Sequence, residues 1–149
     1  MMKNDMVEII LVEDNIDDAT LAIRALKKQN LANNLVHLKD GEEAIQFIFG
    51  TGAYEGRNIS NSPKVIFLDL KMPKVNGMEV LEKIKSDKRT AHIPVVVLTS
   101  SAEDPDINTC YSLGANSYIV KPLGFDDFTH KISELGLYWL VLNELPRKE

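Results

Sequence analysis

Five short apolar runs are spaced along the chain, and several of them are continuous rather than alternating with polar residues. Continuous runs are typical of strands buried on both faces, as in a parallel sheet covered by helices. Between the runs, apolar residues recur every three or four positions, as on the buried face of a helix. This succession of strand and helix units predicts an α/β fold with a doubly wound parallel sheet. The predicted strands lie at about residues 8–12, 34–38, 65–68, 93–98 and 117–120.

Two segments depart from this alternation. Residues 50–63 have no apolar period, and their Gly, Asn, Ser and Pro content predicts a surface loop that is long for a helix-to-strand connection. The last predicted helix, from about residue 125, continues into an apolar extension at residues 134–145. We therefore expect one domain over residues 1–149, with a core at about 7–133 and these two extensions.

Composition places the chain among ordinary globular domains, since 44% of its 149 residues are hydrophobic and 26% are charged. The single cysteine, Cys110, cannot form an internal disulfide, which predicts a reducing compartment. The net charge of −5 offers no basic field for nucleic acid, and no apolar stretch is long enough to cross a membrane. The chain begins without the apolar segment of a signal peptide, so we expect a cytoplasmic protein.

Polar side chains follow four of the five predicted strands. Because the carboxyl ends of parallel strands lie at one edge of a sheet, where ligands bind, these side chains should meet there. Each of them, taken alone, could equally be a helix cap or a solvated turn residue. Together they form a specific set: Glu13 and Asp14 after the first strand, Asp69 after the third, Thr99 and Ser100 after the fourth, and Lys121 after the fifth.

This set of residues predicts a metal ion. Two unit charges 4 Å apart cost on the order of 4 kcal/mol at an effective dielectric of 20, and Lys121 supplies only one positive charge against three carboxylates. A hard divalent cation, most simply Mg²⁺, fits carboxylates without His or Cys. Because Mg²⁺ is usually bound by one or two carboxylates together with phosphate oxygens, a phosphorylated substrate or adduct is expected.

The remaining residues fit phosphoryl transfer, which needs an aligned nucleophile and spread positive charge. Asp69 is the candidate nucleophile, forming an aspartyl phosphate. Lys121 would hold one phosphoryl oxygen as a point charge, and the Thr99 hydroxyl would donate to another. Asp17 and Asp18 fall in the first turn of a helix, where their expected role is only to complement the helix dipole.

With these residues identified, the chain resembles a bacterial response-regulator receiver domain of the chemotaxis type. The resemblance covers about residues 7–133 and implies a flavodoxin-like fold with five helices and a five-stranded sheet in the order 2-1-3-4-5. The matching pattern is Glu13-Asp14, Asp69-Leu70-Lys71-Met72-Pro73 with Gly77, Thr99-Ser100, Tyr118 and Lys121-Pro122.

The resemblance also implies residue roles. Asp69 would take a phosphoryl group from a phosphohistidine of a sensor histidine kinase, so the protein would be a phosphoacceptor rather than a dedicated enzyme. Asp14, Asp69 and the backbone carbonyl of Lys71 would bind Mg²⁺ directly, with Glu13 acting through water. The backbone of Ser100 would contact the phosphoryl group. Glu13 stands where chemotaxis-type receivers more often have Asp, and Lys71 lies near the path of attacking water, which leaves the lifetime of the phosphoryl group open.

By the same resemblance, Thr99 and Tyr118 form a switch pair. The Thr99 hydroxyl would move toward the phosphoryl group and the Tyr118 ring would follow inward. This movement would alter the face made by the fourth helix, the fifth strand and the fifth helix.

The loop at 50–63 and the apolar tail resemble small stand-alone regulators paired with bacterial phytochrome histidine kinases. The tail is apolar on more faces than one core can cover, so we expect a homodimer through the face that carries the C-terminal tail. The alternative is that the last helix is buried more deeply in its own domain. The exposed members would be Leu137, Tyr138, Leu140 and Val141. Residues 143–149 are too few for a DNA-binding or catalytic output domain, so output through protein contact is expected.

Three other functions are less consistent with the sequence. Phosphatases of the haloacid-dehalogenase class require a second acid two residues after the nucleophile, where this chain has Lys71. A flavodoxin-like FMN-binding module requires a hydroxyl- and Gly-rich phosphate-binding loop after the first strand, whereas residues 13–18 here are rich in acids. A receiver that cannot be phosphorylated would lack one of the required groups, and none is missing.

Overall fold

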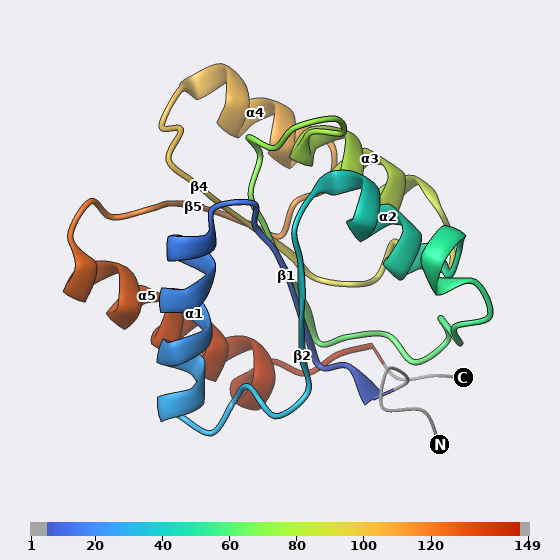
Figure 1. The fold of residues 1–149 in the computed structure, drawn as a ribbon. Coiled ribbons are helices and arrows are strands. Elements are labelled where there is room, and N and C mark those ends of the chain that lie inside the picture. The colour runs from blue at the N-terminus through green and yellow to red at the C-terminus, as the bar shows by residue number, and fades with distance from the viewer. Residues whose placement is uncertain (1–5, 147–149) are drawn as a thin grey trace.

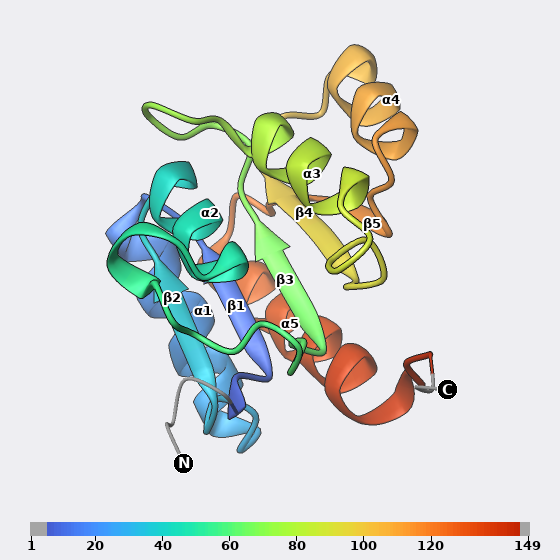
Figure 2. The same ribbon diagram turned by 90° about the vertical axis from the view of Figure 1, so that its right-hand side faces the viewer.

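Five parallel strands in the order β2-β1-β3-β4-β5 form the centre of the molecule in the computed structural model, which describes residues 6–146. Figure 2 shows the strands side by side in this order. The sheet confirms the predicted doubly wound α/β fold, and the first five and last three residues of the expected domain lie outside the described residues. The strands are β1 (Ile9–Val12), β2 (Leu35–Leu38), β3 (Val65–Leu68), β4 (Val95–Thr99) and β5 (Ser117–Val120).

Helices cover both faces of the sheet. Figure 1 shows α1 and α5 on one side and α2, α3 and α4 on the other. Each face has its own apolar core, because alternate residues of a strand point to opposite faces. Since β1, β3 and β4 lie inside the sheet and are covered on both faces, every residue in them is buried, which explains their continuous apolar sequences. The helices are α1 (Ile16–Lys28), α2 (Gly41–Phe49), α3 (Gly77–Ser86), α4 (Asp104–Ser112) and α5 (Phe125–Leu137).

The predicted surface loop at 50–63 contains one short 3₁₀ helix, η2 (Gly52–Tyr54), and otherwise no helix or strand. It is held against the end of α2 by aromatic and cationic contacts. The Tyr54 ring meets the Phe47 ring edge-on at 4.9 Å between centroids, and the Arg57 guanidinium lies 4.0 Å from the centroid of the same ring. Arg57 also donates to the Phe47 carbonyl oxygen at 2.9 Å. These contacts dock the loop on its own domain.

The C-terminal helix changes its winding near its end. The apolar spacing predicts one helix through residue 142, whereas α5 ends at Leu137 and a π-helical segment, η3 (Tyr138–Leu142), follows. The Asn143 N–H donates to the Tyr138 carbonyl oxygen at 2.7 Å, a bond that spans five residues. Trp139 is buried and Leu140 packs on the α1–α5 core, so the expectation that Leu140 faces a partner is not met.

Although Trp139 and Leu140 pack inward, the C-terminal extension at 134–145 still has exposed apolar side chains. Leu137, Tyr138, Val141 and Leu142 are exposed. None of the helices within residues 6–146 is both long enough and apolar enough to span a membrane.

Candidate functional site

The strand register brings the polar strand ends together. Val12 of β1 pairs with Leu68 of β3, so the next residues, Glu13 and Asp69, lie at the same level of the sheet edge. Backbone hydrogen bonds continue past the strands, because the Asp69 N–H donates to the Val12 carbonyl oxygen at 3.0 Å. The Lys121 N–H likewise donates to the Thr99 carbonyl oxygen at 2.7 Å. Residues from four strand ends therefore meet at one edge.

Three carboxylates gather at this edge. Among the described residues, Glu13, Asp14 and Asp69 each offer an oxygen, and these oxygens all lie within 4.8 Å of one another. Glu13 and Asp69 are buried and Asp14 is exposed, so the cluster is open to solvent on the Asp14 side. An all-oxygen donor set with one open side suits a hard divalent cation that keeps part of its water shell, which supports the predicted Mg²⁺ cofactor.

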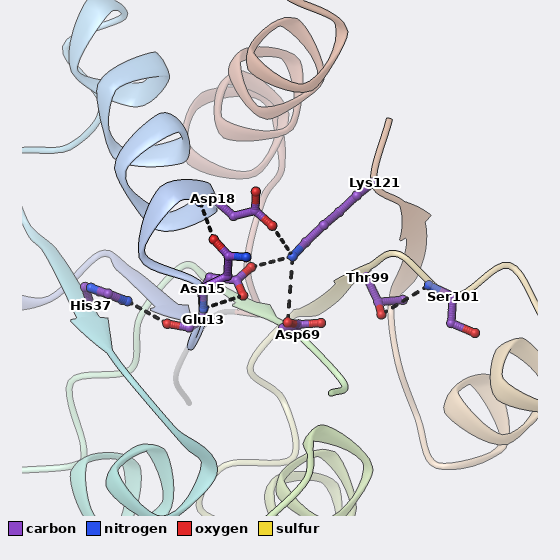
Figure 3. Close-up of polar contacts among 8 residues, drawn as sticks. All are labelled: Glu13, Asn15, Asp18, His37, Asp69, Thr99, Ser101 and Lys121. Carbon is purple, nitrogen blue, oxygen red and sulfur yellow. Dashed lines mark hydrogen bonds and ion pairs between the residues drawn. The ribbon is translucent and has the colours of Figure 1, made fainter. Parts of the chain in front are cut away.

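Lys121 provides the positive charge of the site. Its ammonium lies 2.6 Å from Glu13 Oε1, 2.9 Å from Asp18 Oδ2 and 3.7 Å from Asp69 Oδ2. Figure 3 shows the nitrogen lying between these three carboxylates, which come from the end of β1, from α1 and from the end of β3. The Lys121 side chain is only 10% exposed, so these charge-assisted bonds are little weakened by solvent.

Burial and neighbouring charge shift the pKa values of this pair. Burial raises the pKa of Glu13 to about 8; the hydrogen bond from Lys121 opposes that rise, and the neighbouring Asp69 adds to it. Burial lowers the pKa of Lys121, but the hydrogen bonds to Glu13 and Asp18, together with the negative charges of Asp69 and Glu13, outweigh burial and leave the pKa raised, so the ammonium stays protonated. One ammonium among these acids leaves an excess of negative charge that a divalent cation would balance.

Thr99 and Tyr118 are linked through Ser101. Thr99 is fully buried, and its hydroxyl oxygen accepts from the Ser101 N–H at 3.4 Å. The Tyr118 hydroxyl donates to the Ser101 carbonyl oxygen at 2.9 Å, and the Tyr118 ring packs against the core under α2, α3 and α4. The Ser101 hydroxyl in turn donates to Asp106 of α4 at 2.5 Å. Ser101 therefore joins Thr99 to β5 and to α4 through hydrogen bonds.

The remaining predicted residues lie around the acids. Lys71 and Ser100 are both exposed, in the loops that follow β3 and β4. Asp14 and Lys71 line an open pocket of about 440 Å³ whose apolar wall includes Leu70 and Met72. This pocket places solvent, and room for a ligand, directly beside the carboxylates.

Two contacts of the site were not predicted from the sequence. Asp18, expected only to complement the helix dipole, contacts Lys121. His37 Nε2 on β2 lies 2.8 Å from the Glu13 carbonyl oxygen, and in the tautomer with a proton on Nε2 it donates to that oxygen. The helix period indicates that Asp18 lies on the side of α1 that faces the sheet, because Ala22 and Ala25, four and seven residues later on the same side, are buried. Nothing in the sequence marks the His37 contact.

A doubly wound sheet whose edge combines clustered acids, a buried ammonium and a buried hydroxyl defines a phosphoryl-accepting receiver. The family model described as "Response regulator receiver domain" matches residues 9–133. The chain therefore belongs to the response-regulator receiver family. It is a phosphoaccepting response regulator of two-component signalling, which confirms the function and fold predicted from its motifs.

Two curated relatives match nearly the whole chain. A probable methanogenesis regulatory protein, FilR2 of Methanothrix harundinacea, is 41% identical over 93% of this chain and 86% of FilR2. Response regulator Rcp1 of Synechocystis sp. is 37% identical over 93% of this chain and 92% of Rcp1.

Solved structures of similar proteins share the fold. The Mn²⁺-bound form of Rcp1 has a TM-score of 0.85 at 35% identity, covering 94% of this chain and 99% of that one. The phosphorylated cyanobacterial phytochrome response regulator RcpA has a TM-score of 0.87 at 36% identity, covering 95% and 99%. The bacteriophytochrome response regulator AtBRR has a TM-score of 0.71 at 46% identity, covering 93% and 99%.

Proposed function

We propose that Asp69 is the residue that accepts the phosphoryl group. The observation that carries this proposal is its position in the cluster. Asp69 is buried and lies 3.7 Å from the Lys121 ammonium, whereas both carboxylate oxygens of the other buried acid, Glu13, already accept hydrogen bonds, from Lys121 and from the Asn15 N–H. A carboxylate oxygen of Asp69 attacks the phosphorus of a phosphohistidine on a sensor histidine kinase. The bond from phosphorus to the imidazole nitrogen breaks, and that nitrogen keeps the electron pair.

The acids of the cluster hold the metal ion in this proposal. Asp14, Asp69 and the Lys71 backbone carbonyl are its direct ligands, and Glu13 acts through water. When bound, Mg²⁺ balances the negative charge of the acids and of the transferring phosphoryl group. That the similar protein Rcp1 has an Mn²⁺-bound form supports a divalent cation as cofactor.

Three groups at the ends of β4 and β5 complete the phosphoryl site. Lys121 holds one phosphoryl oxygen through its ammonium, the Thr99 hydroxyl donates to a second, and the Ser100 backbone N–H donates to a third. Movement of Thr99 changes its contact with Ser101, whose carbonyl oxygen binds the Tyr118 hydroxyl. Phosphorylation therefore biases the position of Tyr118 and the face made by α4, β5 and α5.

Phosphorylation in the presence of metal tests the acceptor function. We expect wild-type protein incubated with Mg²⁺ and acetyl phosphate or a phosphoramidate to gain one phosphoryl group, measured by intact mass. Removing Mg²⁺ with EDTA should abolish this gain, because the clustered carboxylates then repel the phosphodonor. A protein that gains no phosphoryl group with Mg²⁺, and fails to bind beryllofluoride, would contradict the proposal.

We also propose a partner and a setting. The similarity to RcpA and AtBRR supports a sensor histidine kinase of the phytochrome type as phosphodonor, and the similarity to FilR2 makes a non-phytochrome kinase the alternative. In this proposal the protein works in the cytoplasm, assists its own phosphorylation and dephosphorylation, and serves signalling rather than dedicated catalysis.

A homodimer is the third part of the proposal. The receiver core at about 7–133 is followed by an extension at 134–145 whose exposed residues include Leu137 (46% exposed) and Val141 (60% exposed). Together with the face made by α4, β5 and α5, this apolar surface suits a second copy of the chain.

Light scattering tests the dimer. We expect a dimer at roughly tens of micromolar wild-type protein, because dimer formation depends on protomer concentration. The variant Val141→Glu should be monomeric, since it places a charge in the apolar surface. Ile16→Glu on α1, which is 66% exposed, is the matched control and should remain dimeric. A monomeric wild type, or equal effects of the two variants, would contradict the proposal.

A further inference from the structure

We propose that Asp18 is a positioning residue for phosphoryl transfer: it holds the Lys121 ammonium so that one N–H remains directed toward Asp69. The inference rests on the proposed roles of Asp69 and Lys121. It concerns an acid on α1 that the receiver motifs do not include.

The donors of Lys121 are shared among three acceptors. A lysine ammonium has three N–H groups and no acceptor. Two of its neighbours are within hydrogen-bonding distance, Glu13 Oε1 at 2.6 Å and Asp18 Oδ2 at 2.9 Å. Asp69 Oδ2, at 3.7 Å, is beyond that distance but within the range of an ion pair. The two close bonds leave the third N–H on the side of Asp69 (Figure 3), where a phosphoryl oxygen would be added.

Asp18 differs from the other two acids in its relation to the metal site. Glu13 and Asp69 belong to the carboxylate cluster, and Asp18 is not part of it. A cation in the cluster would compete with Lys121 for the negative charge of Glu13 and Asp69. It would not compete directly for Asp18. Asp18 can therefore keep its hold on Lys121 when the site is loaded.

Asp18 is itself well placed to act as an anchor. Its backbone N–H donates to Asn15 Oδ1, the N-cap of α1, at 3.0 Å, so the first turn of the helix is fixed. Ala22 and Ala25 on the same side of α1 are buried, so this side packs on the sheet. The Asp18 side chain is 32% exposed, whereas the flexible Lys121 stem that it contacts is 10% exposed. A rigid helix thus limits the movement of a long side chain.

The alternative is that Asp18 only complements the helix dipole. Asp17 shares the same first turn and the same charge, but it is exposed, and no hydrogen bond or salt bridge to Lys121 is found for it. A dipole effect would be similar for Asp17 and Asp18. A positioning effect belongs to Asp18 alone, so the two acids form a matched pair for experiment.

The experiment measures the rate at which each variant gains a phosphoryl group from acetyl phosphate in saturating Mg²⁺. We expect Asp18→Ala to be slower than wild type by roughly tenfold, the size of one charge-assisted hydrogen bond. Asp17→Ala should stay within about twofold, as a surface substitution does. Asp18→Asn keeps an oxygen acceptor at the same place and should stay within about threefold.

A double-mutant cycle separates positioning from a structural role. If Asp18 acts through Lys121, then in a Lys121→Met background Asp18→Ala should cause no further slowing. Urea unfolding of each variant checks that the fold is kept.

Three results would overturn the inference: equal rates for Asp18→Ala and Asp17→Ala, equal losses for Asp18→Ala and Asp18→Asn, or further slowing in the Lys121→Met background. A wild type that gains no phosphoryl group overturns the proposed function and this inference with it. A wild type that is phosphorylated normally, with Asp18→Ala matching Asp17→Ala, overturns only the inference.

Discussion

Asp69→Asn is expected to abolish phosphoryl incorporation, because an amide at this position offers no nucleophilic carboxylate oxygen. Intact mass after incubation with Mg²⁺ and acetyl phosphate measures the loss, which we expect to exceed roughly a hundredfold. The substitution also removes one negative charge from the cluster formed with Glu13 and Asp14. In metal-free buffer the variant should therefore be at least as stable as wild type, with a gain on the order of 1 kcal/mol in the free energy of unfolding.

Asp17→Asn is the control for this substitution, because it removes the same charge from an exposed position beside the same edge of the sheet. It should be phosphorylated like wild type. Urea unfolding distinguishes loss of the acceptor from loss of the fold. An Asp69→Asn protein that still gains one phosphoryl group would show that another residue accepts it.

Gly77→Ala is expected to destabilise the protein and disturb the segment that carries Asp69. Gly77 is the first residue of α3, and a Cβ there would lie 2.2 Å from the Asp69 carbonyl oxygen and 2.6 Å from Leu70 Cα. Both atoms belong to the backbone, which cannot rotate away as a side chain can. We expect a loss of about 3 kcal/mol in the free energy of unfolding, measured by urea denaturation, and slower phosphorylation.

Gly124→Ala provides the matched control. Gly124 is the N-cap of α5, its φ of −81° suits any residue, and the nearest atom to an added Cβ is 3.5 Å away, on the side chain of Asp127. Its substitution should cost no more than about 1 kcal/mol in the free energy of unfolding, the usual loss when an N-cap residue becomes Ala. Equal effects of the two substitutions would contradict the argument. Gly77 does not have a positive φ, so the expected destabilisation rests on the close approach of the Asp69 and Leu70 backbone.

The fold was predictable because its signals are local. The inner strands β1, β3 and β4 are covered on both faces, so they are continuous apolar runs in the sequence. Their starts were less certain, since the fourth strand was expected from residue 93 and begins at Val95. The apolar pattern does not show where strand pairing begins, because a strand that pairs from one or two residues later has the same sequence of apolar residues.

The candidate site was predictable to the same extent. Glu13, Asp69 and Lys121 follow strands and Thr99 ends one. Because parallel strands end at one edge, the meeting of these residues follows from the order of the elements. The individual roles of these residues remain predictions. The winding of the tail was not predictable: Leu140, expected to face a partner, packs partly buried on the α1–α5 core from the π-helical segment that follows α5.

Taken by itself, the sequence determined the kind of sheet, the groups at its edge and the need for a cation, because apolar periodicity and strand-end residues are properties of neighbouring positions. The helix period puts Asp18 on the buried side of α1, but only the tertiary structure decided that it reaches Lys121. Glu13 and Asp18 lie 108 and 103 residues from Lys121 in the chain. Contacts at such separations depend on sheet register and on the rotation of α1 against the sheet, which packing of the whole core sets.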